Sequence, residues 1–249
     1  MIKTSLAQIK KRFLQLHLPK NHIYMIHSSL LRFGIIEGGT KGLVDCIFDT
    51  LGADSTILMP TYTFTFAKSR KWDYKTSKSE VGALTEYFRT NQLSARTIHP
   101  FHSLAVQGKL AKEFSTCRCL SSFGRGSAYE LLYKTNGINI GFGTDFIGGG
   151  TVLHHTEEMS AVPYRYYKNF PGEVADENGV VSGEIFSMYT RREDATTKYS
   201  NVWGHVWNDF LSEHLLSRAP NIFSFDIKMA HDSLLKKLNN NPFYCALKQ

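Results

Sequence analysis

His154 and Glu157 are the side chains of this sequence whose types and spacing best suit acid–base chemistry. They follow a glycine-rich loop at 148–150, where the pattern predicts the start of a helix, and helical residues three positions apart share a face. A neighbouring carboxylate can hold an imidazole in one tautomer, and histidine titrates near neutral pH. The pair is therefore a candidate general base with its support. The alternative is a helix start that packs a histidine and places acids near the positive end of the helix dipole.

A metal site in a hydrolase is a second interpretation of the same region. The candidate ligands would be His99, His102, His154, His155, Glu157 and Glu158. Their spacings match no standard zinc arrangement, and Cys117 and Cys119 are too close in sequence to be typical zinc ligands. We therefore expect no metal, while a metal-dependent hydrolase and a binding protein without catalytic activity stay as alternatives.

The composition is that of an ordinary globular protein with a basic balance. Of 249 residues, 42% are hydrophobic and 20% are charged, and the formal net charge is +7. No apolar run is long enough to cross a membrane, so we expect no integral membrane segment. Lysine and arginine are scattered without a recognisable nucleic-acid-binding module. The positive charge thus favours a phosphate-bearing cofactor or substrate, and no nucleic acid.

The first residues and the cysteines bear on the compartment. Segment 1–16 interleaves charge with leucine and isoleucine at helical spacing, which predicts an amphipathic surface helix and not a secretory signal. Four cysteines are too few and too irregularly placed for a disulfide framework. We expect a cytoplasmic protein. The sequence does not determine the oligomeric state, so an oligomer stays open.

Hydrophobic periodicity predicts an α/β fold. A strand at 23–27, a helix from Gly38-Gly39 to about residue 51 and a strand at 55–60 form a β–α–β unit. The alternation continues with helices at 80–89 and 128–133 and strands at 103–106 and 138–142. The first unit places Ser28, Ser29 and Thr61 just beyond strand ends, where open α/β sheets bind ligands.

The last third of the chain has a different pattern. Segment 163–199 is predicted to be a β-rich insertion with a hairpin turn at 177–179, and helices are predicted at 205–216 and 227–238. We predict one domain over 1–249, with a change of pattern at about residue 160.

The basic and aromatic segment 64–78 has no apolar period and is predicted to be a loop at the mouth of the site. Lys68, Arg70 and Lys71 are its candidate contacts for a diphosphate, and a solvated surface loop is the alternative.

An ordered set of motifs over about residues 23–165 resembles the aminoglycoside 3-N-acetyltransferase family, including its sugar N-acyltransferase relatives. The motifs are His27-Ser28-Ser29-Leu30, Glu37-Gly38-Gly39, Met59-Pro60-Thr61-Tyr62-Thr63, Gly82-Ala83-Leu84, His99-Pro100-Phe101-His102-Ser103, Phe123-Gly124-Arg125-Gly126-Ser127 and Thr151-Val152-Leu153-His154. Each motif is weak by itself, whereas their order and spacing together are specific. The last third resembles the family only in its general pattern. The resemblance implies that residues up to about 160 form the coenzyme-binding and catalytic core and that about 161–249 select the acceptor.

The resemblance implies an N-acyltransferase that uses acetyl-CoA or another acyl-CoA, on a compact αβα fold with a central sheet and a β-rich and helical C-terminal third. It also implies that His154 is the base, that Glu157 supports it, and that His99, His102 and Ser103 line the cleft. The coenzyme site implied by the motifs consists of Ser28, Ser29, Thr61, Phe123, Gly124 and Ser127. The family's aspartate lies about six residues before the histidine, whereas Asp145 lies nine before it, so its part in the site stays open.

The acceptor is predicted to be a small molecule with a primary amine, an amino sugar. The net positive charge favours an amino sugar linked to a nucleotide, destined for surface polysaccharide, over a polycationic aminoglycoside. The alternative is an aminoglycoside 3-N-acetyltransferase that confers antibiotic resistance. Acidic residues of the last third could line a pocket for that polycation: Glu173, Asp176, Glu177, Glu184 and Asp194.

Overall fold

A computed structural model describes residues 3–91, 95–193 and 204–246. Within these ranges the central sheet has seven strands in the order β11-β12-β8-β2-β4-β7-β6. Their bounds, in that order, are Ser217–Ala219, Ile222–Asp226, Ile138–Phe142, Ile23–Ser28, Thr56–Pro60, Leu104–Gln107 and Ala95–Arg96. Strands β8, β2 and β4 are parallel to one another, and the flanking strands pair antiparallel. The carboxyl ends of β8 and β2 therefore meet at one edge of the sheet.

The central strands are apolar on both faces because helices cover both faces. In β2, Met25 packs into one core, and Tyr24 and Ile26 pack into the other. In β4, Leu58 belongs to the first core and Ile57 to the second. This alternation follows from the two-residue period of a strand, and it gives three layers. The predicted αβα fold is confirmed.

The helices divide between the two faces. One face is covered by α1 (Leu6–Leu14), α2 (Gly39–Leu51) and α4 (Ala83–Asn91), and the other by α5 (Ala111–Ser115), α6 (Ala128–Lys134), α8 (His154–Met159), α10 (Gly204–Ser212) and α11 (Ile227–Asn240). Helix α2 begins after Gly38, whose φ of 69° is the left-handed conformation that glycine adopts without strain. The predicted first β–α–β unit is thus present as β2, α2 and β4.

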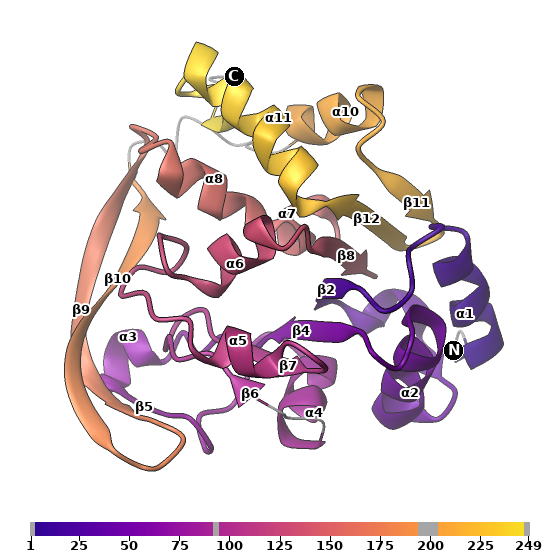
Figure 1. The fold of residues 1–249 in the computed structure, drawn as a ribbon, viewed down its shortest axis with the longest axis horizontal. Coiled ribbons are helices and arrows are strands. Elements are labelled where there is room, and N and C mark those ends of the chain that lie inside the picture. Colours follow the sequence, from indigo (N-terminus) through magenta and orange to yellow (C-terminus); the bar gives the residue numbers. More distant parts are fainter. Residues whose placement is uncertain (1–2, 92–94, 194–203, 247–249) are drawn as a thin grey trace.

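A long hairpin runs along one side of the molecule (Figure 1). Its strands are β9 (Arg165–Ala175) and β10 (Val181–Arg191), and β5 (Lys71–Asp73) extends it as a third strand. The predicted turn at 177–179 lies at the tip of the hairpin. The part of the predicted insertion beyond residue 193 lies outside the described residues.

Segment 64–78 is not a plain loop, contrary to the prediction, because it contains α3 (Phe66–Ser69) as well as β5. Two aromatic side chains anchor it: Phe66 is fully buried and Trp72 is buried to 2% exposure in a cluster with the hairpin. Phe66 lies in a helix of four residues and Trp72 in a strand of three, and elements this short give no periodic pattern in the sequence.

The remaining elements are short. They are β1 (Lys3–Thr4), β3 (Ile35–Ile36), α7 (Phe146–Gly149), η1 (Leu30–Phe33), η2 (Thr151–Leu153) and η3 (Tyr244–Ala246). Strands β11 and β12 of the central sheet had no counterpart among the predictions, because the apolar run at 222–225 is too short to distinguish a strand from a helix. None of the described helices has the length and apolar character needed to cross a membrane.

Candidate active site

His154 and Glu157 lie together at the start of α8. His154 Nδ1 is 2.5 Å from Glu157 Oε2, as their three-residue spacing predicts. Glu157 is completely buried, whereas 23% of the His154 side chain is accessible, so a solute can reach the imidazole. The carboxylate therefore stands behind the histidine, on the side away from solvent.

Two residues from the segment after α8 hold the Glu157 carboxylate. Tyr164 donates its hydroxyl hydrogen to Oε1 at 2.6 Å, and Arg165 Nη2 forms an ion pair with Oε2 at 2.9 Å. Burial by itself would raise the pKa of Glu157, but Arg165, His154 and the hydrogen bond from Tyr164 outweigh it and lower the pKa to about 2. Glu157 is thus a carboxylate at neutral pH.

The ionised Glu157 selects the tautomer of His154. A carboxylate only accepts hydrogen bonds, so Nδ1 of His154 carries the hydrogen and the lone pair lies on Nε2. Burial and the charge of Arg165 lower the pKa of His154, against the opposing effect of Glu157. The imidazole is consequently neutral near pH 7, which is the state that a general base requires.

Phe123 separates His154 from a second histidine. Its ring centroid is 5.2 Å from that of His154 and 4.7 Å from that of His102. His102 is buried, and its Nδ1 is 2.7 Å from the Ser122 hydroxyl. Burial lowers the pKa of His102 well below its ordinary value. His99 accepts a hydrogen bond from the His102 backbone N–H at 3.1 Å, so both histidines act as neutral groups packed beside the site.

The predicted coenzyme residues fall into two groups. Ser28 and Ser29 are half-buried at the carboxyl end of β2, beside the end of β8. In the 123–127 segment, Gly124 is tightly enclosed, since a Cβ there would come within 2.6 Å of Glu158 Oε1. Glu158 also accepts hydrogen bonds from the Ser121 hydroxyl and, at 3.2 Å, from the Phe123 N–H. Glu158 therefore fixes the loop, and Ser127 caps α6 through the Glu130 N–H at 3.2 Å.

Thr61 and Ser103 are fully buried and bound to one another. Their hydroxyl oxygens are 2.9 Å apart, and each accepts a hydrogen bond from Arg96 Nε at 3.2 Å. Arg96 also donates to the backbone carbonyls of Tyr74, Ser77 and Thr61. Both hydroxyls thus belong to a buried network, and the roles of Thr61 in the coenzyme site and of Ser103 in the cleft stay predictions.

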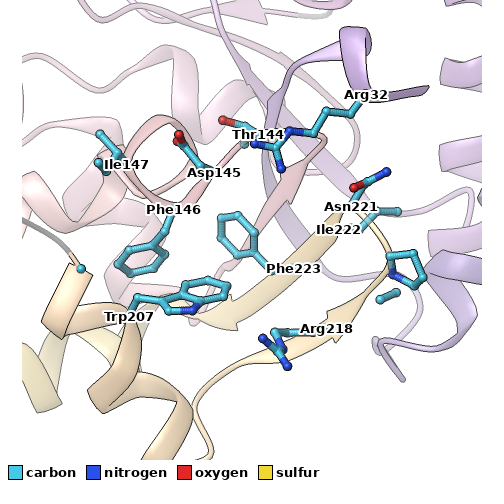
Figure 2. Close-up of a pocket in the computed structure, with 13 residues that line it drawn as sticks. Arg32, Thr144, Asp145, Phe146, Ile147, Trp207, Arg218, Asn221, Ile222 and Phe223 are labelled. Atoms are coloured by element: carbon cyan, nitrogen blue, oxygen red, sulfur yellow. The ribbon is translucent and has the colours of Figure 1, made fainter. Parts of the chain in front are cut away.

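Asp145 is exposed and caps α7, accepting a hydrogen bond from the Gly148 N–H at 2.8 Å. It lines a pocket of about 660 Å³ beside the carboxyl end of β8 (Figure 2). The other lining residues are Arg32, Thr144, Phe146, Ile147, Gly204, Trp207, Arg218, Ala219, Pro220, Asn221, Ile222 and Phe223.

Three residues near His154 were missed by the sequence reasoning. Tyr164 and Arg165 contact Glu157. No rule of sequence spacing predicts a contact between a helix residue and the residues at the start of the next strand. His27 lies within electrostatic reach of His154. Burial, and repulsion between the two imidazoles when both are protonated, lower the pKa of His27 to about 3. Its position at the end of a buried strand in the His27-Ser28-Ser29 motif was the available signal.

The charged side chains nominated for the acceptor lie elsewhere. Arg70 packs over the Phe170 ring at 5.0 Å, and Lys71 pairs with Glu173 at 3.6 Å. Asp176 binds backbone N–H groups of the hairpin turn, and Glu184 lies on β10. None of these side chains lines the 660 Å³ pocket, and Asp194 is outside the described residues. Within those residues, no group of three His, Cys, Asp or Glu side chains could hold a metal ion.

Buried neutral histidines predict a loss of stability in acid. Burial lowers the pKa of His27 to about 3 and those of His99 and His231 to about 4. The unfolded chain binds these protons at about pH 6.5, so the free energy of unfolding falls as the pH drops from about 6.5 towards 4. We expect the urea midpoint of unfolding to fall over this pH window. In His231→Asn, the slope of the unfolding free energy against pH should decrease by the equivalent of about one bound proton. A midpoint that does not change with pH would contradict this account.

Comparison with known proteins places this geometry in a family. A family model described as aminoglycoside 3-N-acetyltransferase matches residues 25–221. The chain is 24% identical over 202 residues to the SPbeta prophage-derived aminoglycoside N(3')-acetyltransferase-like protein YokD of Bacillus subtilis (strain 168), with 72% of this chain and 73% of that protein covered. It is 25% identical over 162 residues to aminoglycoside N(3)-acetyltransferase IV of Salmonella sp, with 64% of this chain and 60% of that protein covered.

A solved structure of AAC-IIIb with CoASH has a TM-score of 0.79 to this chain at 19% identity, with 96% of this chain and 97% of that chain covered. The fold is therefore the same, and the family model matches most of the sequence. The resemblance carried by the motifs is confirmed, and the chain belongs to the aminoglycoside 3-N-acetyltransferase family.

Proposed function

We propose that this chain transfers an acyl group, acetyl in the first instance, from acyl-CoA to a primary amine of an amino sugar. The observation that carries the proposal is the 2.5 Å contact of His154 with a buried, ionised Glu157, which leaves a neutral imidazole accessible to solutes. Family membership and the CoASH-bound relative support coenzyme A as the source of the acyl group.

In the proposed reaction the amine nitrogen attacks the thioester carbonyl carbon, forming the C–N bond. His154 Nε2 takes the proton that the nitrogen loses, and Glu157 stabilises the imidazolium. The C–S bond then breaks, and the proton passes from His154 to the departing thiolate. The products are an amide and coenzyme A, so the protons and electron pairs balance. Arg165 acts through Glu157 as a positioning residue.

Ser28, Ser29 and the 123–127 segment are the proposed coenzyme contacts. We expect acetyl-CoA to bind the free protein with an affinity that falls as salt is added, because salt screens contacts between phosphate and cations. Isothermal titration calorimetry should show weaker binding for Ser28→Ala and Ser29→Ala. Binding that is indifferent to both substitutions would remove these serines from the coenzyme site.

Aminoglycosides are the first candidate acceptors, since the name of the Salmonella relative states that activity. A nucleotide-linked amino sugar is the second candidate, favoured by one observation. Among the described residues that line the 660 Å³ pocket, Asp145 is the sole acid, against Arg32 and Arg218. Such a lining suits an anion better than a polycation.

The two candidates separate in a thiol-release assay with acetyl-CoA. The panel should contain kanamycin- and gentamicin-type compounds, free amino sugars and nucleotide-linked amino sugars, and kcat/KM should be compared across it. We expect at least a tenfold preference for one class, which corresponds to about 1.4 kcal/mol of transition-state binding. Thiol release with none of these amines, under conditions where acetyl-CoA binds, would overturn the proposed function.

The last third of the chain is proposed to select the acceptor while sharing in the catalytic core. It supplies Arg165 to the Glu157 carboxylate, and its strand β12 pairs with β8 in the central sheet. Arg218 and Trp207, which come from the same third, line the pocket. We therefore expect truncation after about residue 160 to prevent folding, as far-UV and near-UV circular dichroism would show.

A further inference from the structure

Arg165 and Arg191 lie directly opposite one another at the end of the β9–β10 hairpin that is away from its turn. Residues opposite each other in an antiparallel pair have Cβ atoms about 4.5–5.5 Å apart, and their side chains share a face. Like charges in this arrangement are destabilising. The hairpin therefore holds two guanidinium groups close together, and negative charge is needed to offset both.

Glu157 offsets only one of the two arginines. Its Oε2 atom is 2.9 Å from Arg165 Nη2 and 2.5 Å from His154 Nδ1, so the carboxylate is already shared. The Arg191 side chain is half-buried and forms no ion pair or hydrogen bond with residues 3–91, 95–193 or 204–246. Burial and the charge of Arg165 lower the pKa of Arg191, but a guanidinium stays protonated at neutral pH. Arg191 is therefore a cation without a negative partner among the described residues.

The next carboxylate along the chain, that of Glu158, has other partners. It accepts hydrogen bonds from the Ser121 hydroxyl, from the Tyr167 hydroxyl at 3.3 Å and from the Phe123 N–H at 3.2 Å. Burial raises the pKa of Glu158, whereas a close ion pair with an arginine would lower it. Glu158 thus holds the loop that carries Ser121 and Phe123, and it does not balance the charge of Arg191.

Arg191 lies on the hairpin side of His154. Its charge contributes to the lowered pKa of His154, so the guanidinium is within electrostatic reach of the imidazole. In Figure 1, β9 and β10 lie to the left of α8, whereas β8 and β2 lie to its right. Ser28 and Ser29, which are proposed coenzyme contacts, lie at the carboxyl end of β2, and Arg191 does not line the 660 Å³ pocket. A ligand that approaches His154 from the hairpin side therefore meets a cation.

We propose that Arg191 binds an anionic group of the acceptor, so that the acceptor is an amine that also carries a phosphate or a carboxylate. A guanidinium binds two oxygens of either group through parallel hydrogen bonds. The anion relieves the repulsion between Arg191 and Arg165 and helps to stabilise the His154 imidazolium, whereas a polycation adds like charge. The inference rests on the proposed function, because Arg191 selects the acceptor only if His154 takes the proton of its amine.

The test compares amines that differ in a single group: glucosamine, glucosamine 6-phosphate, glucosamine 1-phosphate and 2-amino-2-deoxyglucuronic acid, with kanamycin as the polycation. Thiol release with acetyl-CoA gives kcat/KM for each amine, and calorimetry gives the affinity for acetyl-CoA. We expect kcat/KM for at least one anionic amine to exceed that for glucosamine about tenfold. In Arg191→Gln this ratio should fall about tenfold through the KM of the anionic amine, as expected for one lost charge-assisted hydrogen bond. Arg191→Lys keeps the charge and should keep part of the ratio.

Lys168→Gln is the matched control for the loss of one positive charge. Lys168 is exposed on the opposite face of β9 from Arg165, with its Nζ 5.8 Å from the Phe170 ring centroid, so its removal should leave the ratio unchanged. The melting temperature separates binding from packing. Removing Arg191 relieves its repulsion with Arg165, so Arg191→Gln should melt no lower than the wild type, whereas the loss of an arginine that only packs would lower the melting temperature.

Each outcome decides the inference. A preference for anionic amines that Arg191→Gln loses and Lys168→Gln keeps supports it, and the preferred amine distinguishes a phosphate from a carboxylate. A kcat/KM for glucosamine or kanamycin that equals or exceeds that of every anionic amine overturns the inference, while the acyl transfer itself upholds the proposed function. A preference that survives Arg191→Gln, or that both variants lose, also overturns it. Thiol release with none of the amines, although acetyl-CoA binds, overturns the proposed function and the inference with it.

Discussion

Replacing His154 with alanine is expected to lower kcat by about two to four orders of magnitude, the typical contribution of a positioned acid–base group. The imidazole would otherwise take the proton that the amine loses, and Phe123, 5.2 Å away, can neither accept nor donate one. Acetyl-CoA binding and the melting temperature should change little, because 23% of the His154 side chain is already accessible and its partner Glu157 keeps Arg165 and Tyr164.

Glu157→Gln is the matched control for the role of the charge. A glutamine can still accept the hydrogen bond from His154 Nδ1, so the tautomer survives while the stabilisation of the imidazolium is lost. We expect a smaller loss of kcat than for His154→Ala. A folded His154→Ala protein with near-normal kcat would show that another group is the base.

Replacing Arg165 with methionine is expected to have the second largest effect, on stability as well as on rate. The Arg165 and Glu157 side chains are 7% and 0% exposed, so the substitution leaves a buried carboxylate without its main countercharge. Breaking a buried ion pair from one side costs about 3–5 kcal/mol. The free energy of unfolding, measured by urea titration, should fall by that order.

The dependence of kcat on pH distinguishes a positioning role of Arg165 from a packing role. Arg165 lowers the pKa of His154, so its removal should raise that pKa and move the acid limb of kcat to higher pH. Arg165→Lys keeps the charge and should keep the limb in place, although it loses the second contact, from Nη1 to the Tyr189 carbonyl at 3.0 Å. An unshifted limb in Arg165→Met would mean that the arginine only packs.

The core of the fold and the contact between His154 and Glu157 were predictable from the sequence because their signals are local. The buried runs at 23–28 and 56–60 and the glycine before α2 mark a β–α–β unit directly. His154 and Glu157 are three residues apart on one helix, so their contact follows from helix geometry. The order of the motifs added the family, which single spacings could not.

The rest depends on contacts between distant segments. Arg165 contacts Glu157 because β9 begins shortly after α8 ends. Thr61 contacts Ser103 and Arg96 because β4 pairs with β7. The pocket needs β12, a short strand that joins the sheet antiparallel to β8. Net charge could suggest a phosphate but could not locate its contacts, so Lys68, Arg70 and Lys71 stay a prediction for that role.

The most direct test of the central claim is single-turnover acetyl transfer, measured as thiol release and as the acetylated amine by mass spectrometry. Rates should be taken after brief pH jumps between about pH 5 and 8, with the pKa of His154 determined independently by NMR. We predict that the wild-type rate falls through that pKa, below the ordinary value of about 6.5, and that His154→Ala is slow and lacks this limb. Equal rates in the two proteins, or the same acid limb in both, would contradict the account.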